Sequence, residues 1–415
     1  MGVPPDVASN QLCTIGCDPL GHMAGQAVQG YISPIRMNAR ADDKSEPKMG
    51  ALSLPDLETV DRAIAELRRG SAVVILGTGP AGAALVRAAE TVDLWPAPFF
   101  TEAGIGPACL VVTGRRAAVL GLTAPSAQAI QLGCNDLSPA RIRALIDPDV
   151  EQPVPPPDVA ARGVPASDAG HAAVVLAKIA RLLPAVVIAP LIDNSELWTR
   201  RHGRLVVTAA AILRYDQDTA GDLRPISEAR VPLADSEDTR IVSFRPRDGG
   251  AEHLAIIIGA PDPAKPVLAR LHSECFTGDL LASLHCDCGD QLRGAIASIA
   301  KEGGGVLLYL AQEGRGIGLV NKLRAYTLQD RGFDTVDANE QLGFDDDERV
   351  YVPAVRMLRV LGFTRVRLLT NNPAKVGALG RHGIEVVERV AHTFPSNAHN
   401  WSYLQTKAKR SGHLF

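Results

Sequence analysis

Three cysteines in the second half of the chain have the spacing of a metal-binding group. Cys275 is followed by Cys286 and, two positions later, by Cys288. Thiolate sulfur is a preferred zinc ligand, and three protein ligands with an open fourth position are typical of a catalytic zinc that activates water. A fourth ligand from His272 or His285 would instead close a structural site. Spacing alone leaves both alternatives open.

Two predicted strand-to-helix turns have features that suit phosphate. Gly314, Gly316 and Gly318 fall between a predicted strand at 306–309 and a predicted helix at 319–329. Exposed N–H groups and a helix N-terminus favour an anion there, and Arg315 adds a bidentate charge. Thr370 and Lys375 flank a similar turn after a predicted strand at 366–369, where Pro373 suits the first helical position.

Three other polar residues each have a purely structural interpretation as well. Tyr326 falls on the same predicted helix face as Leu319 and Leu323, which is the pattern of a core position. Asp347 belongs to an acidic run, 345–348, that would open a helix and complement its dipole. Lys375 could be a solvated surface lysine.

The elements that position these residues form a mixed α/β pattern in both halves. A helix is predicted from Leu57 to Gly70, and apolar runs at 72–76, 109–112, 186–188, 205–207 and 384–387 predict buried strands. Residues 152–168, rich in Pro and Ala, predict a loop, and the polar stretch 216–238 predicts the main boundary. We therefore expect an N-terminal extension (1–50), a first domain (51–225) and a second domain (226–415).

Composition excludes several classes of function. The 415 residues are 46% apolar and 21% charged, with a net charge of -3, so no global field attracts nucleic acid or an anionic membrane. Aromatic residues make up only 4%, which argues against a base-stacking platform. No apolar run approaches the roughly 20 residues of a membrane span, and no secretory signal is evident. We expect a cytoplasmic protein that binds a small molecule.

Two further motifs carry weaker signals. Residues 77–82 fit the glycine pattern of a dinucleotide site after a strand, but no acidic residue stands at the required distance. Cys13, Cys17 and His22 could form part of a metal site in the N-terminal extension.

The second half resembles GTP cyclohydrolase II. The resemblance rests on ordered motifs at 270–279, 286–292, 312–319, 321–326, 337–344, 369–375, 406–408 and 412–414, and covers roughly 228–415. It implies that Cys275, Cys286 and Cys288 bind Zn²⁺, with Mg²⁺ accompanying the substrate phosphates, and that the chain forms a homodimer. It also implies that Tyr326 orients the water, that Asp347 accepts a proton and that Arg349 attacks the α-phosphate. The implied nucleotide-binding residues are Arg270, Glu274, Gln291, Glu313, Gly314, Arg315, Thr335, Thr370 and Lys375.

The first half resembles a degenerate 3,4-dihydroxy-2-butanone-4-phosphate synthase over about 57–215. The resemblance rests on residues 63–70, 169–171, 183–188 and 202–208. The family's acidic loop is replaced by 77–82 without a carboxylate, Ala172 and Ala173 follow His171, and Pro190 stands in place of Glu. Acid–base catalysis on a sugar phosphate needs those groups. We therefore expect this half to lack that activity and His171 to be structural.

Two departures in the second half bear on the substrate. His285 and Ala311 stand where GTP cyclohydrolase II usually has Arg, and an arginine fork is not replaced conservatively. Together with the divergent first half, they resemble a branch linked to uracil catabolism. The favoured hypothesis is therefore hydrolytic ring opening of a uridine nucleotide. The alternatives are GTP cyclohydrolase II proper, in riboflavin biosynthesis, and a non-catalytic nucleotide-binding protein.

Overall fold

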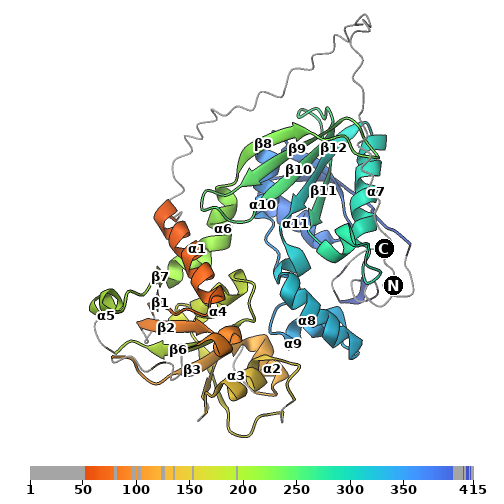
Figure 1. Ribbon diagram of the computed structural model, residues 1–415. Coiled ribbons are helices and arrows are strands. Elements are labelled where there is room, and N and C mark those ends of the chain that lie inside the picture. Colours follow the sequence, from red (N-terminus) through yellow and green to blue (C-terminus); the bar gives the residue numbers. More distant parts are fainter. Residues whose placement is uncertain are drawn as a thin grey trace, which may run out of the picture. The chain divides into compact units, whose positions relative to one another are not determined.

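The computed structural model describes residues 52–412 apart from 79–81, 96–99, 101–103, 123–126, 134–135, 152–153, 193–194, 396–404, 406–407 and 411. The possible metal site at Cys13, Cys17 and His22 therefore lies outside the described residues. The described part contains two seven-stranded sheets with helices packed on them (Figure 1), so the predicted mixed α/β class is confirmed for both halves.

The first sheet has the order β5-β4-β3-β6-β2-β1-β7. Among its described strands, β1 and β7 pair in parallel and the other neighbours are antiparallel. The strands are β1 (Val73–Leu76), β2 (Ala83–Ala88), β3 (Cys109–Thr113), β4 (Ala129–Gly133), β5 (Ala160–Val164), β6 (Ala185–Pro190) and β7 (Val206–Thr208). The loop predicted for 152–168 is wrong at β5, which is an edge strand. Its sequence has low strand propensity, but pairing with β4 makes it a strand.

Helices cover both faces of this sheet. They are α1 (Leu54–Arg68), η1 (Ala89–Leu94), α2 (Gly114–Val119), α3 (Pro139–Ile146), α4 (Ala169–Ile179), α5 (Ser195–His202) and α6 (Ala209–Gly221). Ser53 and Asp56 form a capping box that starts α1. Alternation along β3 divides the core, because Val111 packs with α1, α4 and α6 whereas Leu110 and Val112 pack with α2 and α3 on the other face.

The second sheet has the order β14-β13-β11-β12-β10-β9-β8. Strands β8, β9, β10 and β12 pair antiparallel, and β12, β11, β13 and β14 pair in parallel. The strands are β8 (Arg224–Arg230), β9 (Thr239–Arg245), β10 (His253–Gly259), β11 (Val267–Ser273), β12 (Gly304–Leu310), β13 (Arg365–Leu369) and β14 (Glu385–Val390). The polar stretch 216–238, where the main boundary is predicted, holds the end of α6 (Ala209–Gly221) and the exposed edge strand β8.

The helices of the second half are η2 (Phe276–Leu280), α7 (Cys288–Lys301), η3 (Glu313–Gly316), α8 (Leu319–Asp330), α9 (Thr335–Gln341), α10 (Val352–Val360) and α11 (Pro373–Arg381). Ile256 of β10 packs with α7 on one face of the sheet, and Ile257 packs with α10 and α11 on the other (Figure 1). Because β11, β12 and β13 are parallel, the segments that follow them meet at one edge of the sheet, which is where ligands bind in such folds.

The two halves share a core. Leu328 of α8 and Leu342, which follows α9, are buried in the same cluster as Leu110 of β3 and Leu145 of α3. The first half therefore packs directly on the helices that follow the glycine-rich turn of the second.

The structure argues against two alternatives that the sequence left open. Residues 77–82 connect the antiparallel strands β1 and β2, so the glycine pattern is followed by a strand and not by the helix that a dinucleotide site needs. The acidic run 345–348 precedes α10 by several residues and lies outside its first turn, so the helix dipole does not account for Asp347. Among the described residues, no helix combines the length and apolarity needed to cross a membrane.

Candidate active site

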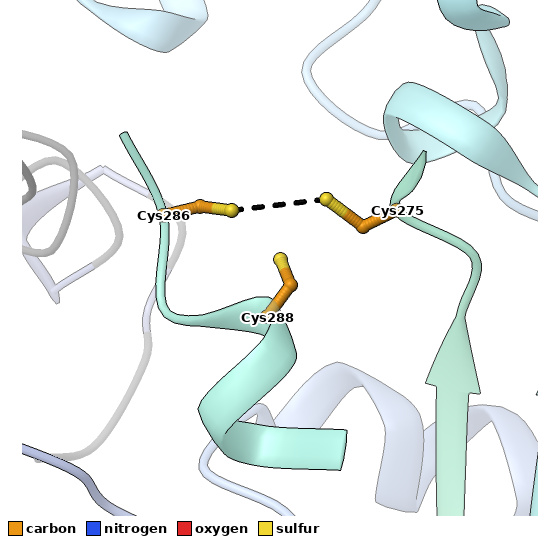
Figure 2. A group of neighbouring side chains, drawn as sticks. All are labelled: Cys275, Cys286 and Cys288. Atoms are coloured by element: carbon orange, nitrogen blue, oxygen red, sulfur yellow. Dashed lines mark hydrogen bonds between the residues drawn. The ribbon is translucent and has the colours of Figure 1, made fainter. Parts of the chain in front are cut away.

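The three cysteines converge at the edge of the second sheet (Figure 2). Cys275 follows β11, Cys286 lies in the loop after η2, and Cys288 is the first residue of α7. Their sulfur atoms lie within 4.8 Å of one another, and those of Cys275 and Cys286 are 3.7 Å apart. Tetrahedral zinc with its usual Zn–S bonds places two sulfur atoms about 3.8 Å apart. The sulfur positions therefore fit one zinc ion.

The charges at the cluster also suit a cation. Hydrogen bonds from the neighbouring thiols and the Lys322 ammonium lower the pKa of Cys275. The pKa of Cys286 is raised to about 11 by its interaction with Cys275, and that of Cys288 is raised for the same reason and by burial. One thiolate therefore opposes the ionisation of the next. A bound dication removes this repulsion, because coordination deprotonates a thiol outright.

Asp279 holds the backbone of Cys275. Its carboxylate accepts hydrogen bonds from the Cys275 N–H at 3.0 Å and from the Tyr309 hydroxyl at 3.0 Å, and it lies 3.0 Å from His272 Nε2. His272 is 3% exposed and its Nε2 is bound to Asp279. Among the described residues, neither of its ring nitrogens belongs to the group of possible ligand atoms that the three cysteines form, so the structure does not place it as their fourth ligand. A carboxylate that holds the backbone of a residue in this way fixes the orientation that the residue would need to bind a metal.

Lys322 joins the cluster to the glycine-rich turn. Its Nζ donates to Cys275 Sγ at 3.0 Å, to Thr277 Oγ1 at 2.8 Å and to Glu313 Oε1 at 3.0 Å. Burial works to lower the pKa of Lys322, but the Cys275 sulfur and the Glu313 carboxylate outweigh it and raise that pKa. The ammonium therefore stays charged beside the Cys275 sulfur.

A cavity of about 140 Å³ beside the cysteines brings most of the predicted site residues together. It is lined by Cys275, Cys286, Cys288, Arg270, Glu274, Gln291, Glu313, Gly314, Arg315, Thr335, Thr370, Lys375, Tyr326, Arg349 and His285. Asp347 and Ala311 are not among its lining residues. Ala311 lines a larger cavity, of about 1020 Å³, between the two halves, which His171 and Arg349 also line.

Buried cations form one side of the smaller cavity. Arg270 is 5% exposed and donates to Leu369 O at 3.0 Å and to the Gln291 side chain, while its Nε has no hydrogen-bond partner among the described residues. Burial lowers the pKa of Arg270 to about 10. Lys375 donates to Leu271 O at 2.8 Å and is buried, so its interpretation as a solvated lysine is wrong. Two buried cations around one cavity suit a phosphorylated ligand.

The glycine-rich turn follows β12 and precedes α8, as predicted. Gly314, Arg315, Gly316 and Gly318 all have positive φ, at 63°, 60°, 100° and 87°. A side chain at Gly316 would meet Glu348, because an added Cβ would lie 2.9 Å from its backbone carbon. The Arg315 guanidinium is bound to Asp346. The turn is therefore packed closely against the segment that carries Asp347 and Arg349.

Tyr326 faces the cavity and not the core. Its hydroxyl lies 3.4 Å from Thr277 Oγ1, and its ring stacks on His285 with centroids 4.9 Å apart and planes 19° apart. Leu323, which the core interpretation placed on the same face, is 50% exposed. Burial raises the pKa of Tyr326, so its hydroxyl stays protonated at neutral pH.

Sequence reasoning missed Asp279, Thr277 and Lys322. Lys322 lies four positions before Tyr326 in α8, which places it on the same helix face one turn earlier. Asp279 lies four positions after Cys275, and its N–H bonds to the Cys275 carbonyl at 2.7 Å. The four-residue spacing from Tyr326 and from Cys275 was therefore the sequence signal that could have indicated Lys322 and Asp279.

Comparison with known proteins assigns the family. A family model described as GTP cyclohydrolase II matches residues 224–391. A relative named GTP cyclohydrolase-2 from Azospirillum brasilense is 53% identical over 387 residues, which cover 91% of this chain and 100% of that protein. The chain belongs to the GTP cyclohydrolase II family. It is therefore a hydrolase of that family, and the resemblance inferred from the sequence motifs is confirmed.

Other relatives extend beyond the second half. GTP cyclohydrolase-2 from Xylella fastidiosa (strain Temecula1) is 39% identical and covers 85% of this chain and 86% of that protein. A riboflavin biosynthesis protein, RibBA, from Salinispora tropica is 40% identical and covers 72% of this chain and 80% of that protein. The solved structure of RibBX, a two-domain 3,4-dihydroxy-2-butanone 4-phosphate synthase from A. baumannii, is 17% identical with a TM-score of 0.32, covering 81% of this chain and 99% of that chain.

Proposed function

We propose that this protein is a zinc-dependent cyclohydrolase that opens the base ring of GTP in riboflavin biosynthesis. One observation carries the proposal: the three cysteine sulfurs line the same cavity as the buried cations Arg270 and Lys375. The names of the relatives that cover nearly all of the chain support GTP as the nucleotide. A bound zinc ion would supply a Lewis acid and an activated water at the cysteines.

The chain's own side chains have distinct proposed roles. Arg270 and Lys375 bind the phosphates, since both are buried and charged. The Tyr326 hydroxyl, placed beside Thr277, orients the attacking water. Arg349 lines the cavity and is the candidate nucleophile at the α-phosphorus, with release of pyrophosphate. The Asp347 carboxylate accepts two hydrogen bonds from the Arg349 guanidinium and is the candidate proton acceptor.

A second candidate substrate is the uridine nucleotide favoured by the sequence. The observation that favours it is His285, which stacks on Tyr326 inside the cavity where the family usually has Arg. Ala311, the other departure, lines the larger cavity and not the one beside the cysteines, so its position does not support a role in substrate choice. The uridine hypothesis stays a prediction.

A substrate comparison separates these functions. Zinc-loaded protein is incubated separately with GTP, UMP, UTP, uridine and uracil, while ring absorbance is followed and products are identified by mass. We expect turnover of GTP with release of formate. Turnover of a uridine compound with GTP left intact would replace this proposal. A homodimer, which the family resemblance implies, is tested on the same sample by light scattering.

A further inference from the structure

Arg181 ends α4 in a conformation that its side chain does not favour. Its φ is 58°, in the left-handed region that glycine adopts without strain. The backbone contacts that end the helix, from Arg181 N to Lys178 O at 2.8 Å and from Leu182 N to Ala177 O at 3.0 Å, need no side chain. Strained residues of this kind concentrate at functional sites, which directs attention to what the Arg181 side chain contacts.

The side chain reaches the glycine-rich turn of the other half. Its Nη2 donates to the carbonyl of Ala311 at 3.0 Å, at the start of the turn. Its aliphatic part lies against Gly318 at the end of the turn, where an added Cβ would come within 3.0 Å of the Arg181 Cβ and Cδ atoms. The Arg181 carbonyl accepts a hydrogen bond at 3.0 Å from the amide of Asn321, which is fully buried.

The turn held in this way is connected to the cysteines. Glu313, within it, accepts hydrogen bonds from the Phe276 N–H at 2.6 Å and from Lys322, which itself donates to Cys275 Sγ. Arg315, within the turn, has a φ of 60°, a left-handed conformation that a residue other than glycine rarely adopts. Such a conformation persists only where its surroundings determine it, so the contacts at both ends of the turn matter for its shape.

The first half also holds the segment that carries Asp347 and Arg349. Thr113 Oγ1 donates to Gly343 O at 2.7 Å, Arg115 Nε donates to Asp345 Oδ1 at 2.9 Å, and Lys178 Nζ donates to Glu348 Oε1 at 2.6 Å. These acceptors precede or flank Asp347 on its segment. Lys178 belongs to α4, the helix that Arg181 ends, so one helix of the first half contacts both segments.

We propose that the first half is a positioning domain for the active site and that Arg181 is its principal positioning residue, fixing the turn at 311–318. GTP is the assayed substrate because of the function proposed above. The contacts of Arg181 do not depend on which nucleotide the protein binds. Because a displacement of about 1 Å at a catalytic group can lower a rate about 100-fold, loss of the Arg181 side chain should slow the reaction without unfolding the chain.

The test uses Arg181→Gly and Arg181→Lys in the full-length protein, with Arg331→Ala as the matched control. Arg331 pairs with Asp149 across the same two halves, at 2.8 Å, but is exposed and lies outside both cavities. Glycine relieves the left-handed strain, so we expect Arg181→Gly to keep or raise the melting temperature. Its kcat for GTP should fall at least about tenfold, with a smaller change in KM. Arg181→Lys keeps the aliphatic part and should recover part of the rate.

Hydrogen exchange supplies a measurement that does not depend on turnover. Amides at 312–318 should exchange faster in Arg181→Gly than in the parent protein or in Arg331→Ala, while those of the β-strands should not change. A parent protein that leaves GTP intact would remove the proposed substrate, yet the exchange comparison would still decide the positioning role. Unchanged kcat with unchanged exchange at 312–318, or a loss of protection throughout both sheets, would overturn the proposal.

Discussion

The Arg349 guanidinium and the Asp347 carboxylate form a bidentate ion pair. Arg349 donates from Nε at 2.7 Å and from Nη2 at 2.6 Å, and its backbone N–H donates to the same carboxylate at 3.1 Å. Burial works to raise the pKa of Asp347, but the paired guanidinium outweighs it and holds that pKa below its ordinary value. The carboxylate is therefore ionised at neutral pH and can accept a proton.

Asp347→Asn should lower activity, because the amide cannot accept a proton and pairs less well with Arg349. We expect kcat for GTP to fall by about 100-fold, within the range of acid–base catalysis. Steady-state kinetics checks this against Asp330→Asn, which changes an exposed carboxylate at the end of α8. Equal kcat values in Asp347→Asn and the parent would contradict the role proposed for Asp347.

The same ion pair makes stability depend on pH. The folded-state pKa of Asp347 lies below the unfolded value of about 3.9, so the pair stabilises the fold above that pH. This contribution is lost as the pH falls through the folded-state pKa. Urea unfolding should therefore show Asp347→Asn less stable than the parent at pH 7, with a smaller difference at about pH 3. A difference that grows on acidification would refute the assignment.

Asp279→Asn tests the support of the metal ligand. The substituted amide loses the charge that binds His272 and the Tyr309 hydroxyl, which frees the Cys275 backbone. We expect zinc affinity to fall by about 10–100-fold, which is the usual loss when a residue that holds a metal ligand in place is changed. Chelator competition measures the change, and Asp290→Asn on the exposed side of α7 is the control. Identical zinc affinity in the two variants would mean that Asp279 does not position Cys275.

Gly278→Ala should displace the cysteines directly. An added Cβ would lie 2.8 Å from Cys286 Sγ and 3.0 Å from Cys275 Sγ, closer than such atoms approach. We expect the purified variant to hold less than about half of the parent's zinc, since ligand geometry sets affinity. Gly380→Ala in α11 is the control, because no atom of the described part of the chain lies within 4 Å of its added Cβ. Equal zinc in both variants by elemental analysis would show that the cluster tolerates the methyl group.

The cysteine cluster and most strands were predictable because their signals are local. Three thiols in a short stretch indicate a metal, and runs such as 186–188 and 306–309 indicate buried strands whatever surrounds them. The parallel order of β11, β12 and β13 then brings Cys275, Glu313 and Thr370 to one edge. The other residues of the cavity were predicted only from the family motifs. Helical or strand periodicity alone would have placed residues such as Tyr326 in the core or Lys375 on the surface.

Contacts between distant segments were not predictable from the sequence. Lysine is usually a surface residue, but the Lys375 ammonium donates to the carbonyl of Leu271 in the interior. Edge strand β5 forms because β4 offers a partner and not because its own residues favour a strand. Arg181 contacts Ala311 across 130 positions, and neither residue carries a motif of its own.

His285 offers a direct test of substrate choice. Its imidazole stacks on Tyr326, with centroids 4.9 Å apart, and both side chains line the cavity beside the cysteines. An aromatic pair of this kind contributes about 0.5–1.5 kcal/mol, so His285→Ala should lower kcat/KM for GTP by about 2–10-fold. His285→Arg restores the residue usual in the family, and its cation should raise the ratio of kcat/KM for GTP to that for UMP. Competition assays with both nucleotides measure that ratio, and a ratio unchanged in both variants would remove His285 from substrate selection.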